Sequence, residues 1–252
     1  SAARNFDALW PLFGEFPGQL MFCSDDKHPD DLMKGHINLL VAAALEKGCE
    51  LFDVLHAACI HPVQHYQLPI GLLRAGDPAD FIRVRNLKTF VVEETWIDGI
   101  CVASGGKTLI SRQTSAVINN FTALPKTAEA FAIPAAGDQK TVQIIQVLDG
   151  QIVTAADLAS LKVLNNKCMS DVSRDILKIA VVNRYAPDAK PAVAFVRGFG
   201  LKAGALASSV AHDSHNIVAV GTDDTVIATA VNAVIEAGGG ISACDDRGTT
   251  RV

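Results

Sequence analysis

The sequence predicts a mixed fold made of a helical amino-terminal part, a compact β segment and a carboxyl-terminal α+β domain. Helical apolar spacing runs through residues 28–60, short alternating apolar groups fill 68–109, and strand-like runs accompany one helix over 141–240. This order of strands and helix favours a largely antiparallel sheet. The domain boundaries that we predict are 1–67, 68–112 and 113–252, with the main division in the polar stretch 111–140.

Composition excludes several classes of protein. With 252 residues of which 49% are hydrophobic, the chain can bury a large core. The net charge is −5 and Lys and Arg are scattered, which argues against nucleic-acid binding. No apolar run approaches the roughly 18 residues of a membrane span, and the amino end lacks the apolar run of a secretory signal. The six cysteines form no CxxC pair, so we expect reduced thiols and a cytoplasmic protein.

The helical part is predicted to contain two helices. Residues 28–49 predict one helix that is capped by Asp30 or Asp31 and ended by Gly48. A second helix, "ELFDVLHAACI", is expected to end before Pro62, because the residue before a proline disfavours the helical region. One face of the first helix is expected to carry Leu32, His36, Leu39 and Ala43 as a stripe.

The β segment is predicted to consist of two hairpins. "IGLLRAGDPADFIRV" (70–84) indicates two strands joined by a Gly-Asp turn, and "FVVEETWIDGICVASGG" (90–106) indicates two more around Asp98-Gly99. Five strands are predicted in the carboxyl-terminal domain: 141–148, 175–185, 192–199, 205–211 and 216–221. Residues 223–240 predict a helix that Thr222 or Asp223 caps and glycine ends.

The stretch "MFCSDD" (21–26) is the first candidate for chemistry. An apolar run that ends in carboxylates is typical of a buried strand that delivers an acid to a cavity. At such a place Asp25 could ligate a metal or move a proton. The alternative is a turn or cap in which Asp25 and Asp26 satisfy backbone N–H groups.

Histidines make two further candidates. His61 and His65 have the i, i+4 spacing of a zinc pair, but Pro62 and the missing glutamate argue against it. In "AHDSHN", His212, Asp213 and His215 stand between two apolar strands. They could bind a metal, carry protons or contact a purine edge, and the alternative is a hydrogen-bonded turn. Nucleotide-loop, serine-hydrolase and HxE…PCxxC deaminase motifs do not occur in the sequence.

Several stretches resemble known enzymes. "FCSDD", "HPDDL", "GHI" and "HPVQHY", followed by the spacing of Gly71, Gly76, Ala79 and Asp80, resemble the closing section of amidohydrolase-superfamily enzymes. "VNRY", "FVRGFGLKAGALASSVAHDSHNIVAVGTDD" and "EAGGGI" resemble the carboxyl-terminal domain of the bacterial adenine deaminase family. The resemblance covers nearly the whole chain, apart from the stretch 111–140.

This resemblance carries definite expectations about fold. It implies an α/β part, the last strand and helices of a metal-dependent hydrolase (β/α)8 barrel, over 1–67. It implies a small β-sandwich segment over 68–112 and an adenine-deaminase-type α+β domain over 113–252. A chain with one barrel strand cannot close an eight-stranded barrel, so the resemblance also implies that an amino-terminal half of the enzyme lies outside this chain.

The resemblance likewise implies an activity and a site. The family hydrolyses adenine to hypoxanthine and ammonia in purine salvage, on a binuclear divalent-metal site, with manganese or iron expected and zinc as an alternative. Asp25 matches the aspartate that ends the eighth strand, which touches the metal and handles the proton of the attacking hydroxide. His212, Asp213 and His215 are expected to close the site over the substrate. Most metal ligands would lie outside this chain, and a homo-oligomer is expected.

Two alternatives stay open at this point. The chain alone could be a non-catalytic scaffold or oligomerisation module, because the other metal ligands of the family cannot be matched in it. The enzyme could also be an amidohydrolase that acts on another cyclic amide or amidine, because most of the loops that read the substrate are not in this sequence.

Overall fold

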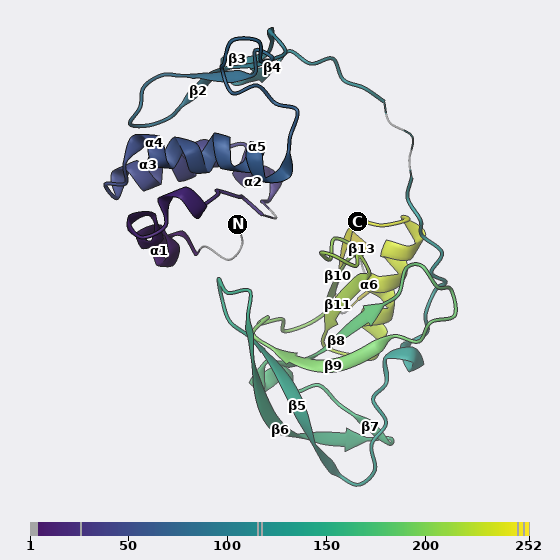
Figure 1. The fold of residues 1–252 in the computed structure, drawn as a ribbon. Helices are drawn as coiled ribbons and strands as arrows, with labels where there is room; N and C mark the ends of the chain where they lie inside the picture. Colours follow the sequence, from purple (N-terminus) through teal and green to yellow (C-terminus); the bar gives the residue numbers. More distant parts are fainter. Residues whose placement is uncertain are drawn as a thin grey trace. The chain divides into compact units, whose positions relative to one another are not determined.

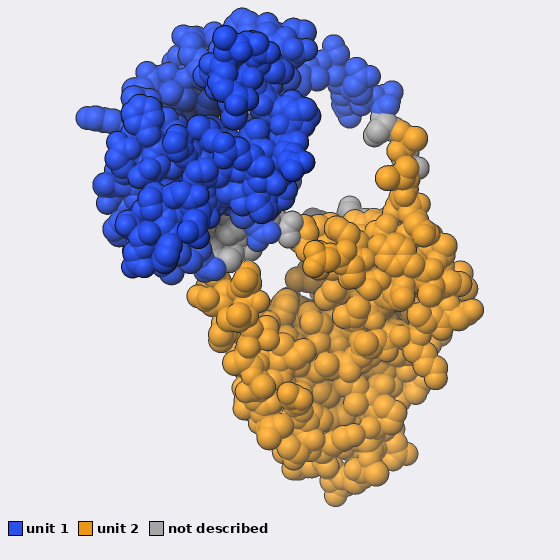
Figure 2. All heavy atoms as spheres, viewed as in Figure 1, with its two compact units in different colours: residues 1–115 blue, residues 116–252 orange. Residues whose placement is uncertain are grey.

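A computed structural model of the chain describes residues 5–25, 27–114, 116, 118–245, 247–248 and 250–251. It divides into two compact units, residues 1–115 and 116–252, which Figure 2 shows in different colours. In the described residues, no helix is long and apolar enough to cross a membrane. All six cysteines are free thiols.

The first unit begins with short helices, which Figure 1 shows in purple and blue. These are α1 (Phe6–Leu9), η1 (Trp10–Gly14), η2 (Pro17–Gln19), α2 (Pro29–Leu32) and α3 (Ile37–Glu46). The prediction of one helix over 28–49 is therefore wrong. Gly35 has a φ of 149° and His36 leaves the helical region, so the helix breaks between α2 and α3. The end at Gly48, with a φ of 89°, is confirmed.

The second helical stretch continues past the proline. It comprises α4 (Leu51–Leu55), the π-helical turn η3 (His56–Ile60) and α5 (His61–Tyr66). The predicted end before Pro62 is wrong, because the π-helical turn accommodates the proline. The N–H of His61 donates to the carbonyl of His56, five residues earlier. Pro62, which has no N–H, then takes a place at the start of α5, where a proline is tolerated.

The core of the first unit lies between these helices and the β segment. Its buried members are Phe13, Val41, Ala44, Val54, Ala57 and Phe90. The predicted stripe of α3 is wrong in detail: Val41 and Ala44 are buried, whereas Leu39 is 41% exposed. The break at Gly35 resets the helix phase, so a stripe counted from Leu32 does not continue into α3.

Only one strand forms where a first hairpin is predicted. Residues 70–73 are not a strand, because carboxylates take up their N–H groups. Asp80 accepts from the N–H of Gly71 at 2.8 Å, and Asp77 accepts from Leu72 at 2.9 Å. Asp80 also accepts from the N–H of Asp98 at 2.7 Å. These backbone donors, Gly71 first, hold the pKa of the Asp80 carboxyl below its usual range.

A four-stranded antiparallel sheet completes the described part of the first unit. Its strands follow in chain order: β1 (Phe81–Val84), β2 (Val92–Ile97), β3 (Ile100–Ser104) and β4 (Lys107–Thr108). The hairpin at Asp98-Gly99 is confirmed, and both residues have the positive φ of a tight hairpin turn. The second sheet that a sandwich would need is not among the described residues of this unit.

The second unit is built on a nine-stranded sheet in the described part of the chain. Its spatial order is β13-β12-β10-β11-β8-β9-β5-β6-β7, and all neighbours are antiparallel except β5 and β9. The bounds are β5 (Gln139–Val147), β6 (Thr154–Leu164), β7 (Lys167–Cys168), β8 (Ile176–Val182), β9 (Ala192–Arg197), β10 (Ala205–Ser208), β11 (Ile217–Gly221), β12 (Ile241–Cys244) and β13 (Thr250–Arg251). The largely antiparallel sheet and its five predicted strands are confirmed, whereas β6, β7, β12 and β13 were not predicted.

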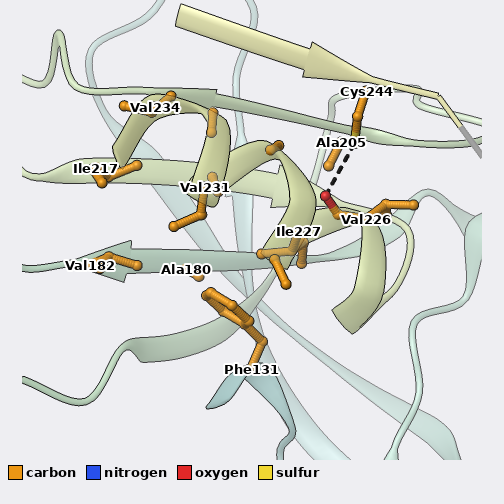
Figure 3. Close-up of a cluster of buried hydrophobic side chains, with 14 residues drawn as sticks. Phe131, Ala180, Val182, Ala205, Ile217, Val226, Ile227, Val231, Val234 and Cys244 are labelled. Carbon is orange, nitrogen blue, oxygen red and sulfur yellow. Dashed lines mark hydrogen bonds between the residues drawn. The ribbon is translucent and has the colours of Figure 1, made fainter. Parts of the chain in front are cut away.

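The helix α6 (Asp224–Glu236) packs on β10, β11 and β12, and the short helices η4 (Ala128–Phe131) and η5 (Val172–Arg174) complete this unit. Asp223 caps α6, as predicted, by accepting from the N–H groups of Thr225 and Val226. Figure 3 shows the core between helix and sheet. The helix contributes Ile227, Val231 and Val234, which are all fully buried.

One buried ion pair lies near this core. Lys178 of β8 is 1% exposed, and its ammonium donates to Asp224 at 2.5 Å, at the first residue of α6. The carbonyl of Phe131 is 3.4 Å from the same ammonium. The pair therefore joins η4, the centre of the sheet and the start of the helix.

Candidate functional site

Asp25 does not end a strand in the described structure. Residues 20–25 belong to no ladder, because a strand exists only through hydrogen bonds to partner strands and none of the described segments supplies them. Asp25 is exposed and has a φ of 52°, and no described residue makes a hydrogen bond to its carboxylate. The expected strand is thus corrected, and Asp26 lies outside the described residues.

The segment that carries Asp25 is held on the helices of the first unit. The carbonyl of Leu20 is 2.7 Å from Nδ1 of His61, and the N–H of Phe22 donates to the carbonyl of Ala57 at 3.0 Å. On either side of Asp25, the Ser24 hydroxyl is 2.6 Å from Nε2 of His36. The Lys27 ammonium donates to the carbonyl of Gly35 at 2.6 Å. These contacts fix the backbone and leave the carboxylate of Asp25 to the surface.

The histidines of "HPVQH" do not form a zinc pair. His61 bonds to Leu20, and its ring lies against that of His56, with centroids 5.7 Å apart. The ring of His65 instead lies edge-on against Tyr66 at 4.7 Å. The two histidines therefore have different partners, which agrees with the structural reading of this motif.

His212, Asp213 and His215 lie together in the loop between β10 and β11. All three side chains are exposed, and the two histidine rings have centroids 5.8 Å apart. The N–H of His215, which has a φ of 50°, donates to the carbonyl of Ala211 at 2.5 Å and closes the loop. The loop is a hydrogen-bonded turn that nevertheless presents two imidazoles and a carboxylate on one surface.

Residues after β8 brace this histidine loop. The Tyr185 hydroxyl donates to the carbonyl of Ser214 at 2.9 Å, and the N–H of Arg184 donates to the Asn216 side chain at 3.2 Å. Neither contact is predicted by the sequence, in which Arg184 and Tyr185 appear only as part of "VNRY". The strand register brings them together, because Val182 of β8 pairs with Ile217 of β11.

Arg184 also binds the stretch that enters the second unit. Its guanidinium lies over the rings of Phe121 and Tyr185, 5.1 Å from each centroid. It donates to the Asn119 side chain at 2.6 Å and to the Asn120 carbonyl at 3.1 Å. Sequence reasoning missed this cluster because its two stretches, 119–121 and 184–185, are more than 60 residues apart.

Two surface hollows formed by described residues of the first unit are lined by residues other than Asp25 and the histidines of "HPVQH". One, of about 640 Å³, lies between α3 and the stretch 87–89. The other, of about 440 Å³, is lined mainly by residues of η1 and of the turn before α4.

The described residues do not bring together a complete set of metal ligands. No group of three or more His, Cys, Asp or Glu side chains comes close enough there to hold an ion. Asp25, an exposed carboxylate without a hydrogen-bond partner among the described residues, could supply one oxygen ligand. The donor set thus fits one ligand of a shared site rather than a complete one.

Two parts of the chain match known protein families. Residues 4–102 match the amidohydrolase family, and residues 151–252 match the adenine deaminase C-terminal domain. The amino-terminal match covers the Asp25 segment, the helices and most of the four-stranded sheet. The carboxyl-terminal match covers the histidine loop and α6. The amino-terminal part of the chain is therefore similar to the amidohydrolases, a family of hydrolases that is generally metal-dependent.

Whole-chain similarity is more specific. The chain is 54% identical over 243 residues to an adenine deaminase of Salinibacter ruber. The aligned region covers 96% of this chain and 44% of that protein. It is 46% identical over 250 residues to an adenine deaminase of Parabacteroides distasonis, covering 99% of this chain and 45% of the relative. It is 51% identical over 245 residues to an adenine deaminase of a Sulfurovum species, covering 96% of this chain and 44% of the relative. The predicted resemblance to the adenine deaminases is confirmed. The chain spans a little under half the length of these curated relatives.

Proposed function

We propose that this chain is part of a metal-dependent adenine deaminase, which hydrolyses adenine to hypoxanthine and ammonia. The observation that carries the proposal is the similarity to adenine deaminases over 96–99% of the chain, at 46–54% identity in the three relatives described. In this reaction a C–O bond forms at C6 of the purine, the exocyclic C–N bond breaks, and the amino group leaves as ammonia. Water supplies the oxygen and the protons.

Asp25 is the proton carrier in this proposal. A divalent metal, when bound, would lower the pKa of water and polarise the purine. The carboxylate of Asp25 would accept a proton from the attacking water and return it to the ring nitrogen or the leaving amine. Its exposure and its lack of a described hydrogen-bond partner leave both oxygens available for this task.

Asp25 would also provide one metal ligand. The remaining ligands would come from the part of such an enzyme that this chain does not cover, because the described residues hold no cluster of three. We propose a binuclear site with manganese or iron, and zinc as the alternative, since carboxylate and imidazole ligands accept all three ions.

The histidine loop is proposed to close the site. His212 and His215 present adjacent rings on the surface, and each imidazole can donate or accept a hydrogen bond at a purine edge. Asp213 would orient one of these rings. The support for this assignment is the exposure of all three side chains on a loop that Tyr185 braces.

The Asp25→Asn variant of the full-length enzyme tests the first assignment. We expect turnover of adenine to fall by about three orders of magnitude or more, because the amide cannot take up the proton. Metal content, measured by elemental analysis, should largely persist because other ligands remain. The matched control is Asp30→Asn, in the exposed first turn of α2, which should keep normal turnover. Near-normal ammonia release from Asp25→Asn would refute the assignment.

The loop is tested by His212→Ala and His215→Ala. A substrate contact predicts a higher KM for adenine or a lower kcat in at least one variant, without a change in metal content. The control is His65→Ala, which removes an exposed imidazole whose ring lies against that of Tyr66. If neither loop variant changes affinity or turnover, the loop is not part of the site.

A second candidate function is that of a non-catalytic scaffold or oligomerisation module. It is favoured for the isolated chain by the incomplete set of metal ligands among the described residues. Ammonia release and metal stoichiometry measured on this chain alone separate the two, and we expect no activity. Activity on another cyclic amide or amidine, measured in the full-length enzyme, would favour the remaining alternative. A homo-oligomer in the cytoplasm completes the proposal, and light scattering measures the oligomeric state.

A further inference from the structure

The backbone at Asp25 is held in a conformation that its own side chain does not stabilise. A non-glycine residue with a φ of 52° is uncommon, and such residues persist only where the surroundings fix them. Asn and Asp often reach this region by bonding locally with their side chains, but the Asp25 carboxylate makes no hydrogen bond to a described residue. The cause must therefore lie in the neighbours of Asp25.

One anchor comes from the π-helical turn. The carbonyl of Ala57 lacks its usual helical donor, because the N–H of His61 donates to His56 instead. The next candidate donor, residue 62, is a proline without an N–H. The carbonyl is thus left for the N–H of Phe22, which bonds to it at 3.0 Å. A buried carbonyl needs a partner, so Pro62 fixes where the segment attaches.

A second anchor lies next to Asp25 itself. The Ser24 hydroxyl and Nε2 of His36 are 2.6 Å apart, within hydrogen-bonding distance. His36 is held in turn, because its N–H donates to the side chain of Asn38 at 2.8 Å. Asn38 also donates to the carbonyl of Phe90, in the buried core. The chain of contacts thus runs from the core through His36 to the residue before Asp25.

We propose that His36 is a positioning residue for Asp25, acting through the Ser24 hydroxyl, with the Pro62 turn as its second support. This inference rests on the proposed function of Asp25 and goes beyond it. In this inference His36, which precedes α3 and does not react itself, fixes the direction of the Asp25 carboxylate. Misplacement of a catalytic group by about 1 Å can cost roughly 100-fold in rate, so the contact has a measurable consequence.

The test uses the full-length enzyme with His36→Ala, His36→Gln and Ser24→Ala. We expect kcat for adenine to fall about 10- to 100-fold in the two alanine variants, while KM changes less than about twofold. The double variant should lose no more than either single one, because both remove the same hydrogen bond. His36→Gln places an amide nitrogen near the position of Nε2 and should restore most of kcat. The control His65→Ala should match the parent enzyme.

A second readout does not depend on activity. In the metal-free full-length protein, His36→Ala should raise amide hydrogen exchange at residues 22–25 at least several-fold, while exchange in α3 and α4 stays unchanged. Pro62→Ala supplies an N–H that competes for the Ala57 carbonyl, and it should raise exchange at Phe22 in the same way. Both results are expected only if these contacts hold the segment.

The outcomes separate this inference from the proposed function. If Asp25→Asn keeps normal turnover, the proposed catalytic role of Asp25 fails and the positioning role of His36 fails with it. If Asp25→Asn is inactive but His36→Ala keeps both normal kcat and normal exchange, only the positioning role is overturned. Equal losses in His36→Ala and His36→Gln, with raised exchange across α3, would show general destabilisation and would also overturn it.

Discussion

The buried pair of Lys178 and Asp224 makes an asymmetric prediction about stability. The Lys178 side chain is 2% exposed and that of Asp224 is 16% exposed. Asp224→Ala leaves a buried ammonium without its counter-charge, which costs about 3–5 kcal/mol. Lys178→Met leaves a partly exposed carboxylate in the first turn of α6, where the helix dipole stabilises a negative charge, and should cost only about 1–2 kcal/mol. The double variant should resemble Lys178→Met.

The assay must report on the second unit. Both tryptophans, Trp10 and Trp96, lie in the first unit, so fluorescence does not follow the change. Amide hydrogen exchange in β8 and α6 does follow it, and about 3–5 kcal/mol corresponds to roughly a 10²- to 10⁴-fold loss of protection. The urea transition seen by tryptophan fluorescence should stay unchanged and serves as the internal control. Equal and additive losses in the two single variants would refute the reasoning.

Two further predictions concern single sites. The Asp171 carboxylate accepts hydrogen bonds from Ser173 and Arg174, which lowers its pKa to about 2. The free energy of unfolding lost in Asp171→Asn should therefore be constant above about pH 4 and vanish as the pH falls towards 2. Urea midpoints of the parent and the variant, measured against pH, check this. Gly71→Ala would place Cβ 1.9 Å from the carbonyl oxygen of Pro78. The free energy of unfolding of the first unit should therefore fall by about 2 kcal/mol or more, which tryptophan fluorescence records as a lower urea midpoint. Gly18→Ala, which has open space around it, should leave the midpoint unchanged.

Alternation and capping predicted much of the second unit, in which α6 packs on β10, β11 and β12. Asp223 caps α6 as the sequence indicates, and β8 reads as an apolar run because six of its seven residues are buried or half-buried on the two faces of the sheet. β6 was not predicted, since its alanines and leucines suit a helix equally well. Its pairing with β5 over nine residue pairs, and with β7 at its end, makes it a strand.

The first unit was harder to predict, because tertiary hydrogen bonds there decide between local alternatives. Pro62 is a sound stop signal for an α-helix, but a π-helical turn removes the conflict. Asp80 converts an expected strand at 70–73 into a loop by accepting from Gly71. Asp25 was predicted from its chemistry and found in a segment without strand partners. A sequence can thus indicate the acid, whereas its direction depends on contacts such as that of His36 with Ser24.

The face of the sheet beneath α6 is made largely of small side chains, among them Ala205, Ala207 and Ala219. At Gly221 an added methyl group would lie 2.6 Å from the Ile227 side chain and 2.7 Å from Ala205. At Gly221 the Ile227 side chain of α6 therefore packs directly on the backbone of the sheet, and an added methyl group there would push the side chain and its helix away. Changes accepted over evolution at this seam must then come as matched pairs, one residue shrinking where its neighbour grows, while isolated growth is selected against.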